Sequence, residues 1–180
     1  MSNPSNHYSR LTIALHWLML LLFIGVYSCI ELRELYPKGS DPREALKAWH
    51  FMLGLTVLIF VFVRIYGRVT SATPPITPPL QAWQHLASKL VHLALYALMI
   101  GLPLLGWATL SAAGKPIPFF GLELPALLAE NKDLAKTLKE LHKTIGEVGY
   151  YLIGIHAAAA LFHHYVQKDN TLTRMLPYRK

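Results

Sequence analysis

LTIALHWLMLLLFIGVYSCI, residues 11–30, contains no charged side chain. An α-helix needs about 20 residues to cross the hydrocarbon core of a bilayer. Three further uncharged stretches follow at residues 48–63, 90–114 and 148–167. Four buried helices of a soluble protein would leave too little of a 180-residue chain to cover them. The sequence therefore predicts an all-α membrane protein, a bundle of four transmembrane helices.

Composition agrees with this fold class. Apolar residues make up 53% of the chain and the mean hydropathy is +0.34, which is high for a soluble domain. The single cysteine, Cys29, rules out a disulfide within the chain, and the lack of a C-x-x-C-H motif rules out covalently attached c-type haem. We expect one integral membrane domain over residues 1–180, with helices at 10–32, 45–68, 82–111 and 138–167.

Four spans place both termini and the loop 70–85 on one face of the membrane, called side A. The loops 31–45 and 114–137 then lie on the opposite face, side B; the second of them mixes turn residues with a short amphipathic piece. The 17 lysines and arginines divide almost equally between the two sides. Because orientation follows the lysine and arginine bias of the loops, the charge pattern leaves the orientation open.

Histidines inside the spans mark a candidate site, because ionisable side chains within a membrane face the bundle interior and carry function. His142 and His156 are 14 residues apart, which places them on one helix face, separated by about 21 Å. Gly149 lies midway between them on the same face, with Gly146 beside it. A strip without side chains would let a flat, bulky group lie against this helix.

Depth along the helices suggests a partner for each of these histidines. His16, near the side A end of the first helix, is level with His156, and His50, near the side B end of the second, is level with His142. Two separated imidazole pairs suit two b-type haems, each held axially by two helices. Zinc fits poorly, since it takes about four ligands at one point. Buried hydrogen-bonding histidines or a proton path are the alternatives, and His92 is a further candidate ligand.

Cationic residues flank both predicted pairs. Arg64 lies 14 residues after His50, near the same helix face but at side A depth, where it could clamp a haem propionate. The alternative is an interfacial arginine that reaches lipid phosphates. Lys47 and Lys139 each precede a predicted ligand by three residues, where a propionate or an incoming anion would be met; a solvated helix end is the alternative.

His163 and His164 lie at the side A boundary of the last span. An imidazole titrates near neutral pH, so these residues could exchange protons at a quinone site. They could equally be interfacial polar residues.

Motifs at both ends of the chain resemble a known family. The segments YSRLTIALHWL (8–18) and HAAAALFHHYVQKDNTLTRMLP (156–177) are similar to the first-helix and last-helix signatures of the bacterial di-haem cytochrome b561 family. The resemblance also includes TPPITPP and HKTIGEVGYYLIG. It implies axial haem ligands at His16, His50, His142 and His156. It also implies a multi-pass protein of the bacterial inner membrane with side A, and hence both termini, in the cytoplasm.

The resemblance implies an activity as well: oxidation of superoxide to dioxygen on side B, with electrons passing through two b-type haems to ubiquinone. Positive charge would guide superoxide to the protein, and Lys47 and Lys139 are the steering candidates. His163, His164 and Asp169 are the candidates for handling the protons of quinone reduction. The expected partners are membrane lipid, ubiquinone and superoxide, and a redox partner protein is left open.

Two other functions remain compatible with the sequence. One is a haem b electron-transfer subunit of a dehydrogenase or hydrogenase complex, and the other is a non-redox transporter that uses histidines as proton relays. No glycine-rich nucleotide loop, Ser/His/Asp set or nucleic-acid patch is present. The net charge of +7 is better explained by membrane-flanking residues than by nucleic-acid binding.

Overall fold

The computed structural model describes residues 7–177. Four long helices dominate it, as predicted: α1 (Arg10–Leu32), α2 (Asp41–Thr70), α3 (Ala82–Ala112) and α4 (Lys132–Phe162). The shorter elements are the 3-10 turns η1 (Arg33–Leu35) and η3 (Thr173–Met175), the π-helical turn η2 (His163–Gln167), and the strands β1 (Pro118–Phe119) and β2 (Leu122–Glu123). All four long helices are long and apolar enough to cross a membrane.

Two helices extend beyond their predicted side B ends. α4 begins at Lys132 rather than near 138, because the side chain of Asn131 accepts a hydrogen bond from the Leu134 amide and caps the helix. α2 begins at Asp41 rather than near 45, with a proline in its first turn, where a missing amide proton costs no helical hydrogen bond. These first turns carry charges, so a search for uncharged stretches does not detect them.

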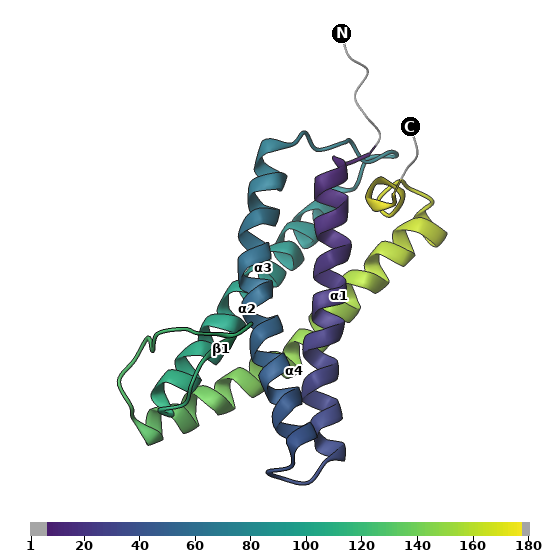
Figure 1. The fold of residues 1–180 in the computed structure, drawn as a ribbon. Coiled ribbons are helices and arrows are strands. Elements are labelled where there is room, and N and C mark those ends of the chain that lie inside the picture. The colour runs from purple at the N-terminus through teal and green to yellow at the C-terminus, as the bar shows by residue number, and fades with distance from the viewer. Residues whose placement is uncertain (1–6, 178–180) are drawn as a thin grey trace.

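The four helices form two antiparallel pairs (Figure 1). α1 packs along α2, α3 packs along α4, and α2 contacts α3 to join the pairs. α1 and α4 share few contacts, and the α3–α4 pair is inclined to the α1–α2 pair. α1 starts and α4 ends at the same end of the bundle, which is side A. A seam therefore runs between α1 and α4, the two helices that carry three of the four predicted ligands.

The packed core is small and central. Met19, Val57, Val61 and Met99 are buried where α1, α2 and α3 meet. At most 17% of the residues in each apolar span are buried within the bundle. Many of the other apolar side chains are exposed on the outside of the bundle, as expected for helices surrounded by lipid.

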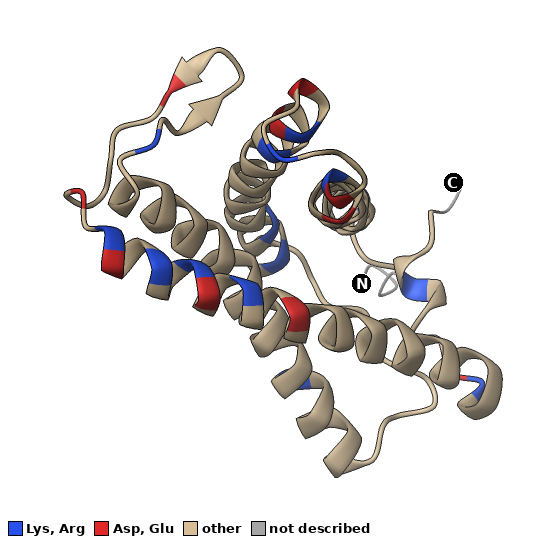
Figure 2. Cartoon of the chain, turned by 90° about the horizontal axis from the view of Figure 1, so that it is seen from below, with Lys and Arg blue, Asp and Glu red and all other residues tan. Residues whose placement is uncertain are grey.

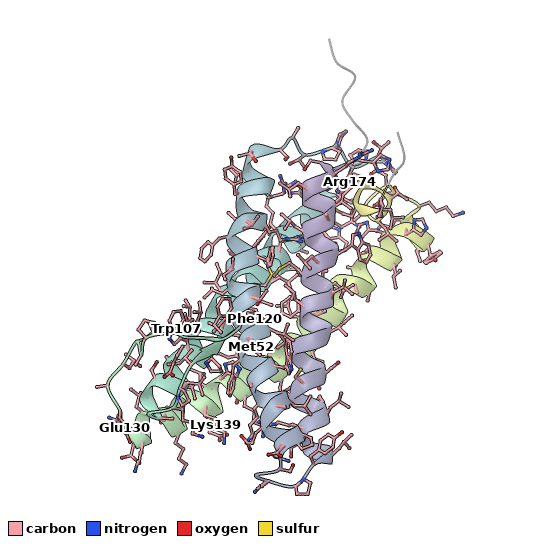
Figure 3. The ribbon with its side chains drawn as sticks, in the orientation of Figure 1. Met52, Trp107, Phe120, Glu130, Lys139 and Arg174 are labelled. Atoms are coloured by element: carbon pink, nitrogen blue, oxygen red, sulfur yellow. The ribbon has the colours of Figure 1, made fainter. Side chains whose placement is uncertain are left out.

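The side B segment between α3 and α4 forms a β-hairpin, with β1 antiparallel to β2, and not the short amphipathic piece that we expected. Its tip is held against α2, because the Phe120 amide lies 3.3 Å from the sulfur of Met52 (Figure 3). The indole of Trp107 donates to the Pro125 carbonyl at 3.0 Å. Ile117 packs against Leu55 of α2 and Leu110 of α3, so the segment lies against the flank of these two helices.

The segment that follows α4 folds back over side A (Figure 3). Asn170 accepts a hydrogen bond from the Thr77 amide at 2.9 Å, and the guanidinium of Arg174 donates to the Pro74 carbonyl. The indole of Trp17, on α1, donates to the Met175 carbonyl at 2.8 Å. These bonds tie α1, the proline-rich link after α2 and the C-terminal segment together at the side A end of the seam.

Candidate functional site

The structure brings the four predicted ligands together as two pairs. The imidazole centroids of His16 (α1) and His156 (α4) are 6.1 Å apart, with their planes at 65°. Those of His50 (α2) and His142 (α4) are also 6.1 Å apart, with their planes at 75°. α4 therefore contributes one histidine to each pair, and its partners come from the α1–α2 unit.

The spacing within each pair fits imidazoles on opposite sides of one metal ion. Metal–imidazole bonds of about 2.0 Å put the centroids of two such rings about 6 Å apart. The ring of His92, on α3, lies 5.2 Å from that of His156, which is shorter than this arrangement requires. Within residues 7–177, no group of three or more His, Cys, Asp or Glu side chains is arranged to hold a metal ion.

Glycines make room beside the side B pair. A cavity between α2, α3 and α4 is lined by both histidines of this pair together with Gly54 and Gly106. A Cβ atom at Gly106 would lie 3.2 Å from Cε1 of His142, so a larger residue there would push the ring a few tenths of an ångström away from α3. Nδ1 of His50 lies 3.0 Å from the Val26 carbonyl and donates to it, which leaves Nε2 with its lone pair free to bind a metal.

A guanidinium lies beside the side A pair. Nη1 of Arg64, on α2, is 3.0 Å from Nδ1 of His16 on α1. Nε of Arg64 is buried without a hydrogen-bond partner among the described residues. Nδ1 of His92 is engaged elsewhere, at 2.6 Å from the Ser88 carbonyl. The structure thus places Arg64 at side A depth next to a predicted ligand.

The glycine strip of α4 is only partly open. At Gly149, a Cβ atom would collide with the hydroxyl of Tyr27 and lie 2.9 Å from Leu98. At Gly146, a Cβ atom would meet nothing within 4 Å, although the Gly146 carbonyl accepts a hydrogen bond from Tyr27 at 2.9 Å. The expectation of a strip that admits a flat group is therefore wrong at Gly149, where a tyrosine fills the space.

Two tyrosines, which sequence reasoning did not single out, bridge the seam between α1 and α4. The rings of Tyr27 and Tyr150 lie 4.1 Å apart, and the Tyr150 hydroxyl donates to Glu31 at 2.7 Å. The sequence signal for this contact was indirect. Tyr27 lies 11 residues after His16, close to three full turns, and so shares its helix face.

The steering candidates differ in their surroundings. Lys47 forms an ion pair with Glu44 at 2.6 Å, within one helical turn. Lys139 is exposed on the side B part of α4, where charged residues concentrate (Figures 2 and 3), and forms no ion pair with any described residue. Two further side B cations, Arg33 and Lys143, are paired with Glu34 and Glu147. An uncompensated positive charge is therefore found at Lys139 rather than at Lys47.

Of the three residues predicted to handle protons, the structure brings two together, His163 and Asp169. Nδ1 of His163 and a carboxylate oxygen of Asp169 lie 2.5 Å apart, and the other carboxylate oxygen accepts from the Thr171 amide at 2.8 Å. His164 lies against Tyr165 and takes no part in this pair. Burial pushes the pKa of Asp169 up, but its hydrogen bonds with His163 and Thr171 outweigh burial and hold that pKa below its ordinary value of 3.8.

We expect Asp169→Asn to loosen the C-terminal segment at neutral pH. A carboxyl whose pKa is lowered in the folded protein stabilises it above the unfolded pKa, and this contribution is lost as pH falls through the folded pKa. In the native chain, the protection factors of the amides of residues 169–176, which correct for the intrinsic pH dependence of exchange, should therefore stay high down to about pH 4 and fall below it. In the variant the same amides should exchange about tenfold faster at pH 7, as expected for loss of a charged hydrogen bond.

Asp133→Asn, in the first turn of α4 on side B, is the control and should leave exchange of residues 169–176 unchanged. Equal exchange of this segment in native protein and Asp169→Asn at pH 7 would contradict the assigned role.

Four membrane-length helices with two facing imidazole pairs at different depths define a class of site, that of membrane cytochromes b. Comparison with known proteins identifies the family. Residues 7–178 match the family described as prokaryotic cytochrome b561. The chain belongs to this family, which carries haem b and resides in the membrane.

The similarity to individual relatives extends over whole chains. "Cytochrome b561 homolog 1" of Escherichia coli (strain K12) is 41% identical over 175 residues, which cover 97% of this chain and 99% of that protein. "Probable superoxide oxidase CybB" of Yersinia pestis is 42% identical over 173 residues, which cover 96% of this chain and 97% of that protein. "Cytochrome b562" of Cereibacter sphaeroides is 29% identical over 175 residues and 94% of each chain.

Proposed function

We propose that this chain is a membrane oxidoreductase that binds two haem b groups, oxidises superoxide to dioxygen on side B and reduces ubiquinone on side A. The observation that carries the proposal is the pair of equal imidazole separations, 6.1 Å each, at two depths of one bundle. The name of the Yersinia relative supports the choice of superoxide as the electron donor. Family membership favours this redox function over a histidine-containing transporter.

In this proposal, His16 and His156 hold one haem and His50 and His142 hold the other. The donor sets fit, because each pair presents two neutral nitrogen ligands from different helices at the required separation. When bound, the haems supply one-electron carriers near the two faces of the membrane. The protein positions the ligands: the Val26 carbonyl orients His50, and Gly106 leaves room for His142.

Arg64 is the proposed propionate partner on side A. A histidine that binds iron through Nε2 carries its proton on Nδ1 and cannot accept a hydrogen bond there. A guanidinium only donates, so the contact between Arg64 and Nδ1 of His16 is incompatible with that tautomer. Arg64 then needs another acceptor, and a propionate carboxylate offers two oxygens to its N–H groups.

Lys139 is the proposed steering residue for superoxide. It lies about one turn before His142, exposed and without an ion pair among the described residues. An unpaired surface cation raises the local concentration of a small anion and thus its encounter rate. Lys47 is the weaker of the two candidates, because the carboxylate of Glu44 compensates its charge.

His163 and Asp169 are the proposed proton-handling pair for ubiquinone. Two superoxide ions and one quinone give two dioxygen molecules and one quinol, and this reaction takes up two protons. Asp169 accepts from Nδ1 of His163, which fixes the imidazole tautomer and leaves Nε2 available for proton exchange. His164 does not join this pair, so its proposed role is limited to the same side A surface.

Stopped-flow spectroscopy of the purified, haem-loaded chain tests the proposal. We expect superoxide to reduce the haems, and added ubiquinone to reoxidise them, without a second protein. Lys139→Gln should slow reduction about two- to fivefold at low ionic strength and less at high salt, because screening removes the attraction. His163→Phe should slow reoxidation by quinone and leave reduction by superoxide unchanged.

Lys47→Gln is the matched control for Lys139→Gln and should have the smaller effect. A loaded chain that superoxide does not reduce, but that accepts electrons from a co-purifying dehydrogenase or hydrogenase, would instead support an electron-transfer subunit. Failure of ubiquinone to reoxidise the reduced haems would refute the assigned acceptor.

A further inference from the structure

We infer that the two sites differ electrically, so that the site of His16 and His156 holds the haem of higher reduction potential, with Arg64 raising that potential. This inference rests on the proposed function, because it requires both pairs to bind haem. The observation behind it is that the polar groups nearest to His16 and His50 differ in charge. His50 faces a backbone carbonyl, whereas His16 faces a guanidinium.

One side B ligand faces a backbone acceptor. Nδ1 of His50 donates to the Val26 carbonyl at 3.0 Å, whereas Nδ1 of His142 is buried without a hydrogen-bond partner among the described residues. Donation of an imidazole N–H to a carbonyl makes the ring a more basic, more electron-donating ligand. Such a ligand favours the oxidised, more positive form of an iron centre and so lowers its reduction potential.

The side A ligands are next to a positive charge. The guanidinium of Arg64 is 3.0 Å from His16, is partly buried with its Nε shielded from solvent, and has no ion pair with any described carboxylate. A positive charge in a medium of low dielectric constant favours the reduced, less positive form of a nearby iron centre. Arg64 also raises the reduction potential if it pairs with a propionate, because it then compensates a negative charge close to the haem.

Most of the remaining charges act in the same direction, and Lys139 on side B, exposed and without an ion pair among the described residues, is an exception. On side B, three cations within reach of the helix ends are paired with carboxylates: Arg33 with Glu34, Lys47 with Glu44 and Lys143 with Glu147. On side A, Asp169 is the only acidic residue, and its carboxylate is bound to His163. Arg68 and Arg174 lie on this side, both over the ring of Tyr8. The side A site is therefore the more electropositive of the two.

Unequal potentials would give electron flow a direction. An electron delivered at side B would move toward the site of higher potential at side A, where the proposed quinone-handling residues lie. The charge pattern around the ligands would thus favour oxidation of a donor at side B and reduction of an acceptor at side A.

Spectroelectrochemical titration of the haem-loaded protein tests this inference without measuring activity. We expect two resolved midpoint potentials in the native chain, and a selective fall of the higher one in Arg64→Met, so that the gap between them narrows. Arg64→Lys keeps the charge and should retain most of the gap. Arg68→Met, one turn further along α2, is the control and should shift the higher potential less. His50→Ala, which removes a side B ligand, should retain the haem of higher potential.

The outcomes separate this inference from the proposed function. If Arg64→Met holds both haems and leaves both potentials unchanged, or lowers only the lower one, the inference fails while the proposed function stands. If His50→Ala retains the haem of lower potential, the inference also fails. A native chain that binds no haem would refute the proposed function itself. Arg64→Gln, which keeps a hydrogen-bond donor, gives the same comparison if the methionine variant loses haem.

Discussion

His16→Ala should lower the haem content of the purified protein from two per chain to one, and His142→Ala should do the same for the other site. Each change removes one of the two proposed axial ligands, and a single imidazole holds a b-type haem poorly because no covalent link retains it. Pyridine haemochrome spectra, normalised to protein concentration, measure this ratio. Substitutions outside the four ligands should change the haem content less than these two do.

His92→Ala is the decisive control, because the ring of His92 lies closer to His156 than that of His16 does, at 5.2 Å against 6.1 Å. We expect this variant to keep two haems, since the shorter distance leaves too little space for a metal ion between opposed rings. Loss of a haem in His92→Ala, with retention of both in His16→Ala, would show that α3 rather than α1 supplies the ligand.

Gly149→Ala should destabilise the folded protein by about 1–3 kcal/mol, the usual range for an added methyl group in a full space. The new Cβ atom would collide with the hydroxyl of Tyr27 and crowd Leu98, so α1 and α3 would both have to move away from α4. Denaturant titration in detergent, followed by circular dichroism, measures the change in the free energy of unfolding.

Gly154→Ala is the matched control on the same helix, because a Cβ atom there meets nothing within 4 Å. It should be neutral, or stabilising by up to about 1 kcal/mol, from the higher helix propensity of alanine. Adding Tyr27→Phe to Gly149→Ala removes the colliding hydroxyl and should recover part of the lost stability. If Gly149→Ala and Gly154→Ala changed the free energy of unfolding equally, the Tyr27 contact would not be the cause of the destabilisation.

The sequence predicted those parts of the molecule that follow from local patterns. Uncharged stretches of membrane length gave the four helices, and the 14-residue spacing of His142 and His156 placed both on one face. The juxtaposition of His16 with His156 followed from depth alone, because antiparallel helices of fixed rise bring opposite positions to the same level. These inferences need no knowledge of how side chains pack.

Features that depend on contacts between distant segments could not be predicted from local sequence patterns. The sequence predicted free space beside Gly149. In the structure this space is filled by the side chain of Tyr27, which is 122 positions away in the sequence. The tip of the side B hairpin is fixed by Phe120 and Met52, neither of which has a recognisable motif. The pairing of Asp169 with His163 requires the chain to turn sharply at Lys168, in a left-handed conformation that non-glycine residues seldom adopt.

The presence of α4 in both histidine pairs has a consequence for biogenesis. This helix is the last of the four to leave the ribosome, so a nascent chain with three inserted helices has only unmatched imidazoles from the first two. If both pairs bind haem as proposed, neither haem can be held by two ligands until synthesis of the fourth span is complete. Haem binding would then depend on completion of the polypeptide, and a chain terminated before α4 would lack haem.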